Sequence, residues 1–197
     1  MGGKAMSKAV LISIRPKWVE KIASGEKTIE VRKTRPKLET PFKTYIYCTM
    51  PDAMAPHNIL ELHGADGKIR KANGKVIGEF TCDAITRVNI CGFWDDSGKQ
   101  LDNRLKETCL TTEEFCKYLG ENVGYGWHIS NLKIYDAPKK LGEFWRDCLE
   151  YSELSTNCWS CENVCGDGDE TGCNTDGRLY LHRPPQSWCY VEAVEDE

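Results

Sequence analysis

The N-terminal part of the chain contains a strand, a short helix and a second strand, and this order constrains the fold more than any other feature. Residues 8–14, KAVLISI, form a continuous apolar run rich in β-branched side chains, which favours a buried strand. Pro16 then occupies the first position of a helix in RPKWVEKIAS. The next segment, KTIEVRK, alternates as a strand does, with Thr28, Glu30 and Arg32 on one face. The sequence therefore predicts a strand with one charged face close to the start of the fold.

Strand patterns dominate the rest of the chain. TYIYCTM, VIGEFTCDAITRVNI, GWHISNLKIYD and SWCYVEAV each read as a strand, and Gly78 marks a bulge or bend in the second of them. Residues 51–74 read as a long loop or a hairpin insertion. This order predicts an α+β fold of about six strands and two or three short helices, with a mixed or antiparallel sheet that closes into a small barrel.

Two segments outside these strands have helical features. TTEEFCKYLGE predicts a short helix with Thr111 or Thr112 as its N-cap. In this helix Phe115, Tyr118 and Leu119 share an apolar face, as Trp18 and its helical neighbours do in the first helix. APKKLGEFWRDCLE reads as a helix or a turn.

Composition places the chain among globular proteins. Hydrophobic residues make up 40% and charged residues 28% of its 197 residues, and the longest apolar run is too short to cross a bilayer. The first residues lack the apolar core of a secretory signal, so we expect a cytoplasmic protein without membrane contact. We expect one domain over residues 6–197, with residues 155–180 as a cysteine-rich insertion.

Charge is distributed unevenly along the chain. The net charge of −4 argues against a protein that holds duplex nucleic acid by bulk electrostatics. Residues 1–45, however, carry eleven Lys and Arg residues against four Glu residues, and Arg15 is among them. A local basic face at the N-terminal end is therefore compatible with the acidic total.

The first charged strand carries a spaced motif, Gly-x-Lys-x-x-Glu-x-Arg, formed by Gly25, Lys27, Glu30 and Arg32. With the strand and helix before it, this unit resembles the opening motif of the ASCH domain family. VIGEF, GWHISNLKIYDAPKKL and RPPQSWCYV extend the resemblance, and the second of these looks like phage-type members. The resemblance implies a PUA-like β-barrel that binds RNA or a modified nucleotide in a cleft beside the motif.

The side chains of the motif suit such a ligand. Arg32 has the geometry to donate two hydrogen bonds to a phosphate or a base edge, and Lys27 supplies a point charge. Glu30 either accepts from an exocyclic amine or holds Arg32, and Arg15 is a further candidate for ligand binding.

Trp127 and His128 are neighbours on a later strand, so alternation places them on opposite faces and only one of them lines the cleft. Trp127 offers a stacking surface for a base, or else packs in the core.

Enzymatic activity is the main alternative function. Some relatives implied by the resemblance are amidohydrolases of acetylated cytidine that use Lys, Thr and Glu. Lys27 matches their Lys, but Glu30 stands where they have Thr, which leaves Thr28 as the candidate nucleophile beside Lys27 and Glu30. Other relatives are ribonucleases, for which Lys27, Arg32 and His128 are suitable groups. A third interpretation is a protein-interaction module of phage or mobile-element origin.

Four cysteines lie close together near the C-terminal end, in the series C-x2-C-x3-C-x7-C formed by Cys158, Cys161, Cys165 and Cys173. Four thiolates at such spacing have the ligand number of a closed structural Zn²⁺ site, without an open position for water. Free thiols or an oxidised pair are the alternatives.

Overall fold

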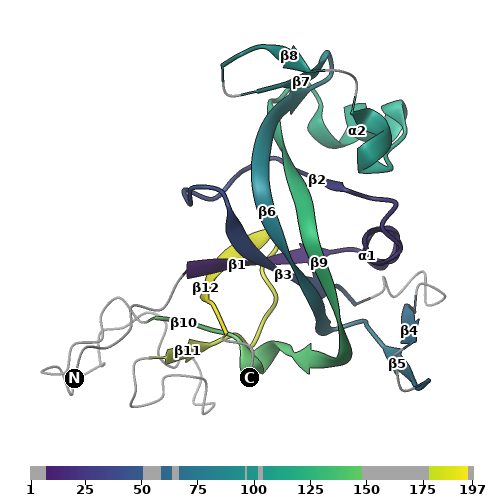
Figure 1. Cartoon of the computed structure of the whole chain (residues 1–197), viewed down its shortest axis with the longest axis vertical. Coiled ribbons are helices and arrows are strands. Elements are labelled where there is room, and N and C mark those ends of the chain that lie inside the picture. Colours follow the sequence, from purple (N-terminus) through teal and green to yellow (C-terminus); the bar gives the residue numbers. More distant parts are fainter. Residues whose placement is uncertain are drawn as a thin grey trace, which may run out of the picture.

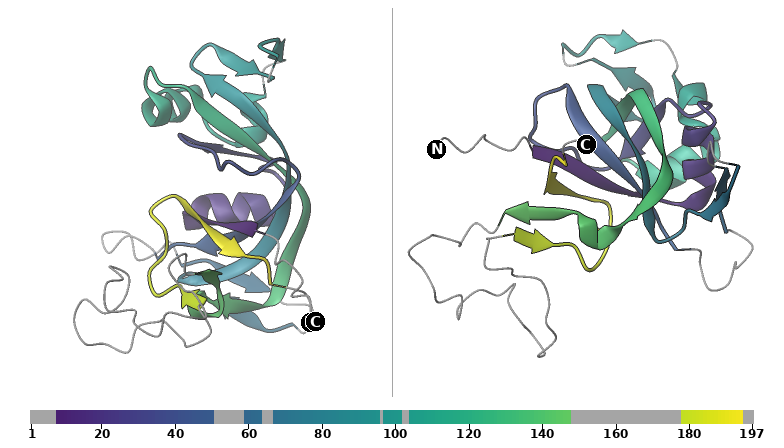
Figure 2. Two further views of the ribbon diagram at one scale, coloured as in Figure 1. Left: turned by 90° about the vertical axis from the view of Figure 1, so that its left-hand side faces the viewer. Right: turned by 60° about the horizontal axis from the view of Figure 1, so that its bottom comes forward.

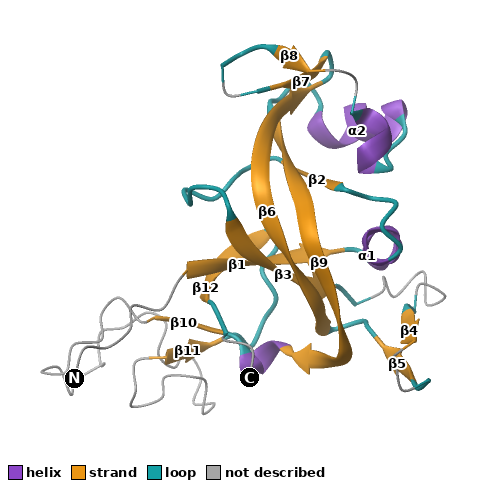
Figure 3. Cartoon of the chain, viewed as in Figure 1, coloured by secondary structure: helices purple, strands orange, loops and turns teal. Residues whose placement is uncertain are grey.

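A computed structural model of the chain describes residues 8–50, 59–63, 67–95, 97–101, 104–147 and 178–194. The helices are α1 (Pro16–Ala23), α2 (Thr112–Leu119) and two 3-10 helices, η1 (Leu105–Thr108) and η2 (Leu141–Glu143). The strands are β1 (Lys8–Ile14), β2 (Ile29–Arg32), β3 (Phe42–Cys48), β4 (Glu61–His63), β5 (Ile69–Lys71), β6 (Lys75–Asn89), β7 (Gly92–Trp94), β8 (Gln100–Leu101), β9 (Gly124–Lys140), β10 (Trp145–Asp147), β11 (Arg178–Tyr180) and β12 (Trp188–Glu192). Figures 1 and 3 show how these elements are arranged.

Eight of the strands form one mixed sheet around β6. β1 lies between β12, which is antiparallel to it, and β3, which is parallel. β3 pairs with the first part of β6 and β7 with its end, while β9 follows the other edge of β6. β2 pairs with the edge of β9 that faces away from β6. The antiparallel pairs β4–β5 and β10–β11 form two small separate sheets.

The two longest strands, β6 and β9, curve along the length of the molecule and give the sheet a barrel-like shape (Figure 2). Their pairing shifts register three times, and such irregularities bend a strand and increase its twist. One shift lies between Val76 and Gly78. A Cβ atom at Gly78 would lie 2.4 Å from the carbonyl oxygen of Lys133, so only glycine permits this close approach. The predicted irregularity at Gly78 is therefore confirmed.

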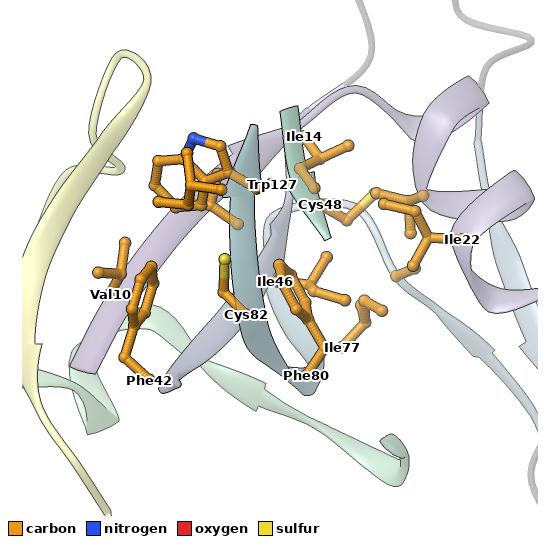
Figure 4. Close-up of a cluster of buried hydrophobic side chains, with 14 residues drawn as sticks. Val10, Ile14, Ile22, Phe42, Ile46, Cys48, Ile77, Phe80, Cys82 and Trp127 are labelled. Atoms are coloured by element: carbon orange, nitrogen blue, oxygen red, sulfur yellow. The ribbon is translucent and has the colours of Figure 1, made fainter. Parts of the chain in front are cut away.

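The core lies inside this curved sheet. Residues of β1, β3 and β6 pack there, together with Val19 and Ile22 from the buried side of α1 (Figure 4). A separate apolar cluster packs against the opposite face of β2, where Ile29 and Val31 contact Phe115 of α2. Since Ile29 and Val31 are turned toward α2, the side chains of Glu30 and Arg32 are directed away from it.

The expectation of an α+β fold with a mixed sheet and short helices is confirmed. The six predicted strands correspond to β1, β2, β3, β6, β9 and β12. The β4–β5 hairpin lies within residues 51–74, which were predicted as a loop or a hairpin insertion, whereas the other short strands were not predicted. Residues 137–147 do not form an α-helix: β9 continues to Lys140, and η2 and β10 follow. Within the residues described, no helix combines the length and the apolar character that a membrane span requires.

Candidate ligand-binding site

The motif residues are positioned by the sharp turn between α1 and β2. Gly25 has φ +78°, a left-handed conformation that glycine adopts without strain. After this turn the amide of Lys27 donates a 2.9 Å hydrogen bond to the carbonyl of Lys21, which ties the segment back to the last turn of α1. Lys27 thus precedes β2 by two residues and still faces the same space as Glu30 and Arg32, since all three line one pocket.

Glu30 forms ion pairs with both cations of the motif. Its Oε2 lies 3.2 Å from Lys27 Nζ, and its Oε1 lies 3.0 Å from Arg32 Nη2. All three residues are buried, with relative exposures of 2% for Lys27, 6% for Glu30 and 8% for Arg32. One carboxylate therefore serves two largely buried cations, and the formal charge of the triad of Lys27, Glu30 and Arg32 is positive.

The remaining donors of the triad reach main-chain and hydroxyl groups from distant parts of the chain. Lys27 Nζ donates to the carbonyl of Thr108 at 2.6 Å, and Arg32 Nη2 donates to the carbonyl of Ser13 at 2.6 Å. Arg32 Nη1 lies 3.5 Å from Ser187 Oγ. Arg32 Nε is buried and has no hydrogen-bond partner among the described residues. An unpaired buried donor costs about 1–3 kcal/mol, so this arrangement is not optimised for stability alone.

The triad forms part of the wall of a cavity of about 520 Å³. Trp18 of α1 and Tyr118 of α2 provide aromatic walls, Arg15 is exposed at the rim, and residues 184–187 close the side next to β12. This volume falls within the range of roughly 300–1,000 Å³ that small-molecule sites occupy.

Each aromatic wall of the pocket lies close to a cation. Lys27 Nζ is 5.3 Å from the ring centroid of Trp18, and Lys33 Nζ is 5.4 Å from that of Tyr118. The Tyr118 ring is only partly covered, and the desolvation of its phenol raises the pKa further above neutral pH, where a tyrosine is uncharged. The pocket therefore combines neutral aromatic surfaces with positive charge.

Comparisons with known proteins give a limited result. No family model matches the chain, and no curated protein matches it either. Solved structures that are similar to it include an ASCH protein from Zymomonas mobilis and two point mutants of that protein. Their sequence identities are 21%, 20% and 19%, and their TM-scores are 0.47, 0.47 and 0.46. Each match covers 68% of this chain and 73%, 77% and 74% of the other chain, respectively. At this level of similarity, a function for the chain has to follow from the geometry of its own pocket.

Four of the residues singled out in the sequence come together in this pocket: Lys27, Glu30, Arg32 and Arg15. Thr28 is not among them. Its side chain is exposed, its amide donates to the carbonyl of Glu107, and its own carbonyl accepts from the amide of Ile129. The hydroxyl that the amidohydrolase interpretation requires is therefore not beside Lys27 in the pocket.

Neither Trp127 nor His128 lines the pocket. Trp127 is fully buried and contacts Phe42 and Trp188 at ring-centroid distances of 5.9 and 6.0 Å, so it belongs to the core (Figure 4). His128 is on the opposite face of β9, where its Nε2 lies 2.9 Å from Arg104 Nη1. Of the two alternatives for Trp127, stacking on a base or packing in the core, the structure shows core packing, because core residues fill the strand face that Trp127 shares with Glu30.

Cys158, Cys161, Cys165 and Cys173 lie outside the described residues. Within the described ranges, no group of three or more His, Cys, Asp or Glu side chains has an arrangement that would hold a metal ion. The structural zinc site stays a prediction from the sequence.

Proposed function

We propose that the pocket around Lys27, Glu30 and Arg32 binds a nucleotide, either free or as an unpaired unit of RNA. The observation that carries this proposal is the net positive charge of the buried triad, in which Glu30 is the single acid between two cations. A buried charge without full compensation is costly, and an anionic or strongly accepting ligand group would balance it.

The aromatic walls suit the base of such a ligand. Trp18 and Tyr118 come from different helices and both line the cavity, so a planar ring can stack on either of them. Arg15 at the rim is exposed, and it is suited to a phosphate group that remains in contact with water. The size of the cavity, about 520 Å³, is sufficient for a ligand of this class.

Binding is favoured over amide hydrolysis by the position of Thr28, the candidate nucleophile of that alternative, and by the contacts of Lys27. Thr28 is exposed outside the cavity, and Ser13 Oγ already donates a 2.6 Å hydrogen bond to the carbonyl of Pro185. Lys27 is held in place by Glu30 and by the carbonyl of Thr108. These contacts support a role for Lys27 as a fixed positive charge rather than as a partner of a nucleophile.

The direct test is calorimetric titration with the four ribonucleoside 5′-monophosphates and the four nucleosides. We expect saturable binding of at least one monophosphate to the unmodified protein. Arg15→Gln, an exposed substitution that leaves the fold intact, should weaken it about tenfold, which corresponds to about 1.4 kcal/mol. Arg32→Lys should weaken it further, because lysine cannot reproduce the guanidinium geometry.

Lys106→Gln provides the matched control, since Lys106 is exposed and does not line the pocket. It should bind as the unmodified protein does. Absence of binding to every probe, or equal affinities for the Arg15 and Lys106 variants, would contradict the proposal.

A further inference from the structure

We infer that an unpaired nucleic-acid strand leaves the pocket along residues 33–40, the segment that connects β2 to β3. This segment is called the basic segment from here on. The inference rests on the proposed function, and it adds that the natural ligand is a strand with several nucleotides rather than a free nucleotide. Figure 1 shows the connection crossing to the start of β3 on the side of the molecule away from α1.

The basic segment concentrates positive charge in an acidic chain. Lys33, Arg35 and Lys37 are all exposed and directly follow Arg32, the motif arginine, whereas Glu39 is the single acid of the segment. The whole chain has a net charge of −4. Phosphate contacts with a strand depend on such local clusters of Lys and Arg, so the acidic total does not oppose binding here.

The segment is anchored to the body of the protein although it lacks regular secondary structure. Pro36 is buried, and the amide of Lys37 donates a 2.7 Å hydrogen bond to the hydroxyl of Tyr190. Trp188 Nε1 donates a 3.0 Å hydrogen bond to Thr34 Oγ1. The three cations therefore project from a fixed backbone, which lowers the entropy that a strand would have to overcome on binding.

Aromatic rings accompany the cations. Lys33 lies over Tyr118, which is also a wall of the pocket, and the Arg35 guanidinium carbon lies 5.6 Å from the ring centroid of Tyr125. Tyr125 pairs with Arg32 in the register of β2 and β9. Stacking of bases on aromatic rings beside a basic groove is the usual way in which proteins bind single strands.

A second hollow lies further along the basic segment. It has a volume of about 610 Å³ and is lined by residues 35–40 together with Ile85 of β6. Arg32 and Tyr118 line the pocket of the triad, Lys33 lies over Tyr118, and the next cations, Arg35 and Lys37, line the second hollow. The geometry gives one base a place in the pocket and gives the following phosphates contacts along the basic segment.

Fluorescence anisotropy with a labelled ten-nucleotide RNA of mixed sequence, and with the DNA of the same sequence, tests this inference. The variant to compare is Lys33→Gln/Arg35→Gln/Lys37→Gln. Its matched control is Lys68→Gln/Arg70→Gln/Lys71→Gln, which removes two lysines and one arginine at the separate β4–β5 hairpin. Both are compared at several salt concentrations, and the nucleoside 5′-monophosphates are titrated in parallel.

We expect the unmodified protein to bind a strand at least tenfold more tightly than it binds any monophosphate. The basic-segment variant should lose at least tenfold in strand affinity but only about threefold or less in monophosphate affinity, since Lys33 is the one residue of the three that lies over a wall of the pocket, Tyr118. The slope of its log affinity against log salt concentration should become shallower by about 2. Each of the three lost contacts between a cation and a phosphate accounts for roughly 0.7 of this slope on a single strand. The hairpin variant should retain both affinities. Preference for RNA over DNA would indicate that the 2′-hydroxyl is read.

The outcomes separate this inference from the proposed function. If monophosphates bind but a strand binds no better, or if the two triple variants behave alike, the inference is wrong and the proposed function stands. If the unmodified protein binds neither monophosphates nor strands, the proposed function fails and the inference fails with it.

Discussion

Arg32 on β2 donates a 2.6 Å hydrogen bond from Nη2 to the main-chain carbonyl of Ser13 on β1. These strands are not neighbours in the sheet, because β2 pairs with β9 and β1 pairs with β3 and β12. The arginine of the motif therefore bridges two parts of the curved sheet at the place where the pocket lies. Its positive charge and its structural contact belong to the same guanidinium group.

Replacing Arg32 with lysine tests this double role. Arg32→Lys keeps the charge but removes the planar group that reaches Glu30 and Ser13 together. We expect the free energy of unfolding to fall by about 1–3 kcal/mol, because buried acceptors lose a charged donor. Urea denaturation followed by circular dichroism measures this change. An unchanged midpoint would show that the bridge contributes nothing to stability.

Glu30→Gln should lower the free energy of unfolding strongly, although glutamine has nearly the same size and shape as glutamate. The substitution removes the carboxylate between Lys27 and Arg32 and leaves two buried cations without an acid. Removing one partner of a buried ion pair costs about 3–5 kcal/mol, so we expect a loss of this order in urea denaturation. Glu26→Gln is the matched control, since the pair of Glu26 with Lys21 is at the surface, where solvent screening weakens an ion pair. Equal effects of both variants would refute the interpretation of the triad.

The N-cap of α2 supports one wall of the pocket. Thr111 Oγ1 accepts a hydrogen bond from the Glu114 amide, and the Glu114 carboxylate accepts one from the Thr111 amide. Thr111→Ala should therefore lower the free energy of unfolding by about 1 kcal/mol. Thr112→Ala, one residue further along, serves as the control, because Thr112 is in the first turn of α2 and is not the N-cap. The prediction is wrong if the two alanine variants lose the same stability.

The side chain of His128 makes stability depend on pH. Its pKa is lowered by burial and by the Arg104 guanidinium, while Asp83 and Glu107 oppose the shift. Below about pH 6.5 His128 binds a proton more readily in the unfolded chain than in the native protein, which favours unfolding. The stability that depends on a neutral His128 is therefore fully present above that pH and is lost as the pH falls. The urea midpoint of the unmodified protein should drop between about pH 7.5 and pH 5.5 by more than that of His128→Gln. If the urea midpoints of the two proteins fell equally over this pH range, His128 would not be the source of the pH dependence.

The sequence predicted the main strands and the convergence of the motif because both depend on local spacing. Alternation placed Glu30 and Arg32 on one face, and the pairs that Glu30 makes with Arg32 and Lys27 confirm this. The N-cap was also predicted, as one of two adjacent threonines, because a capping box is a local pattern. Short strands such as β7 and β8 have too few residues to show periodicity, so they were not predicted.

The rest of the pocket depends on contacts that no local pattern contains. The carbonyls of Ser13 and Thr108 are main-chain groups, which every residue has, and the fold alone brings them to Arg32 and Lys27. Trp18 and Tyr118 share apolar helix faces with core residues, and their role as pocket walls depends on what lies opposite them. Trp127 was ambiguous for the same reason: alternation defines two faces of β9 but does not identify the one that the core fills.

The most direct measurement of the central claim is an NMR titration of the ¹⁵N-labelled protein with nucleoside 5′-monophosphates. We predict saturable shifts of the Arg32 Nε–H and Trp18 indole resonances and of the Ser187 amide, since all three residues line the pocket. The resonances of Trp94, which lines a separate hollow beside Arg87, should not change. Shifts confined to Trp94 and its neighbours, or no shifts at all, would contradict the proposal that the buried triad binds a nucleotide.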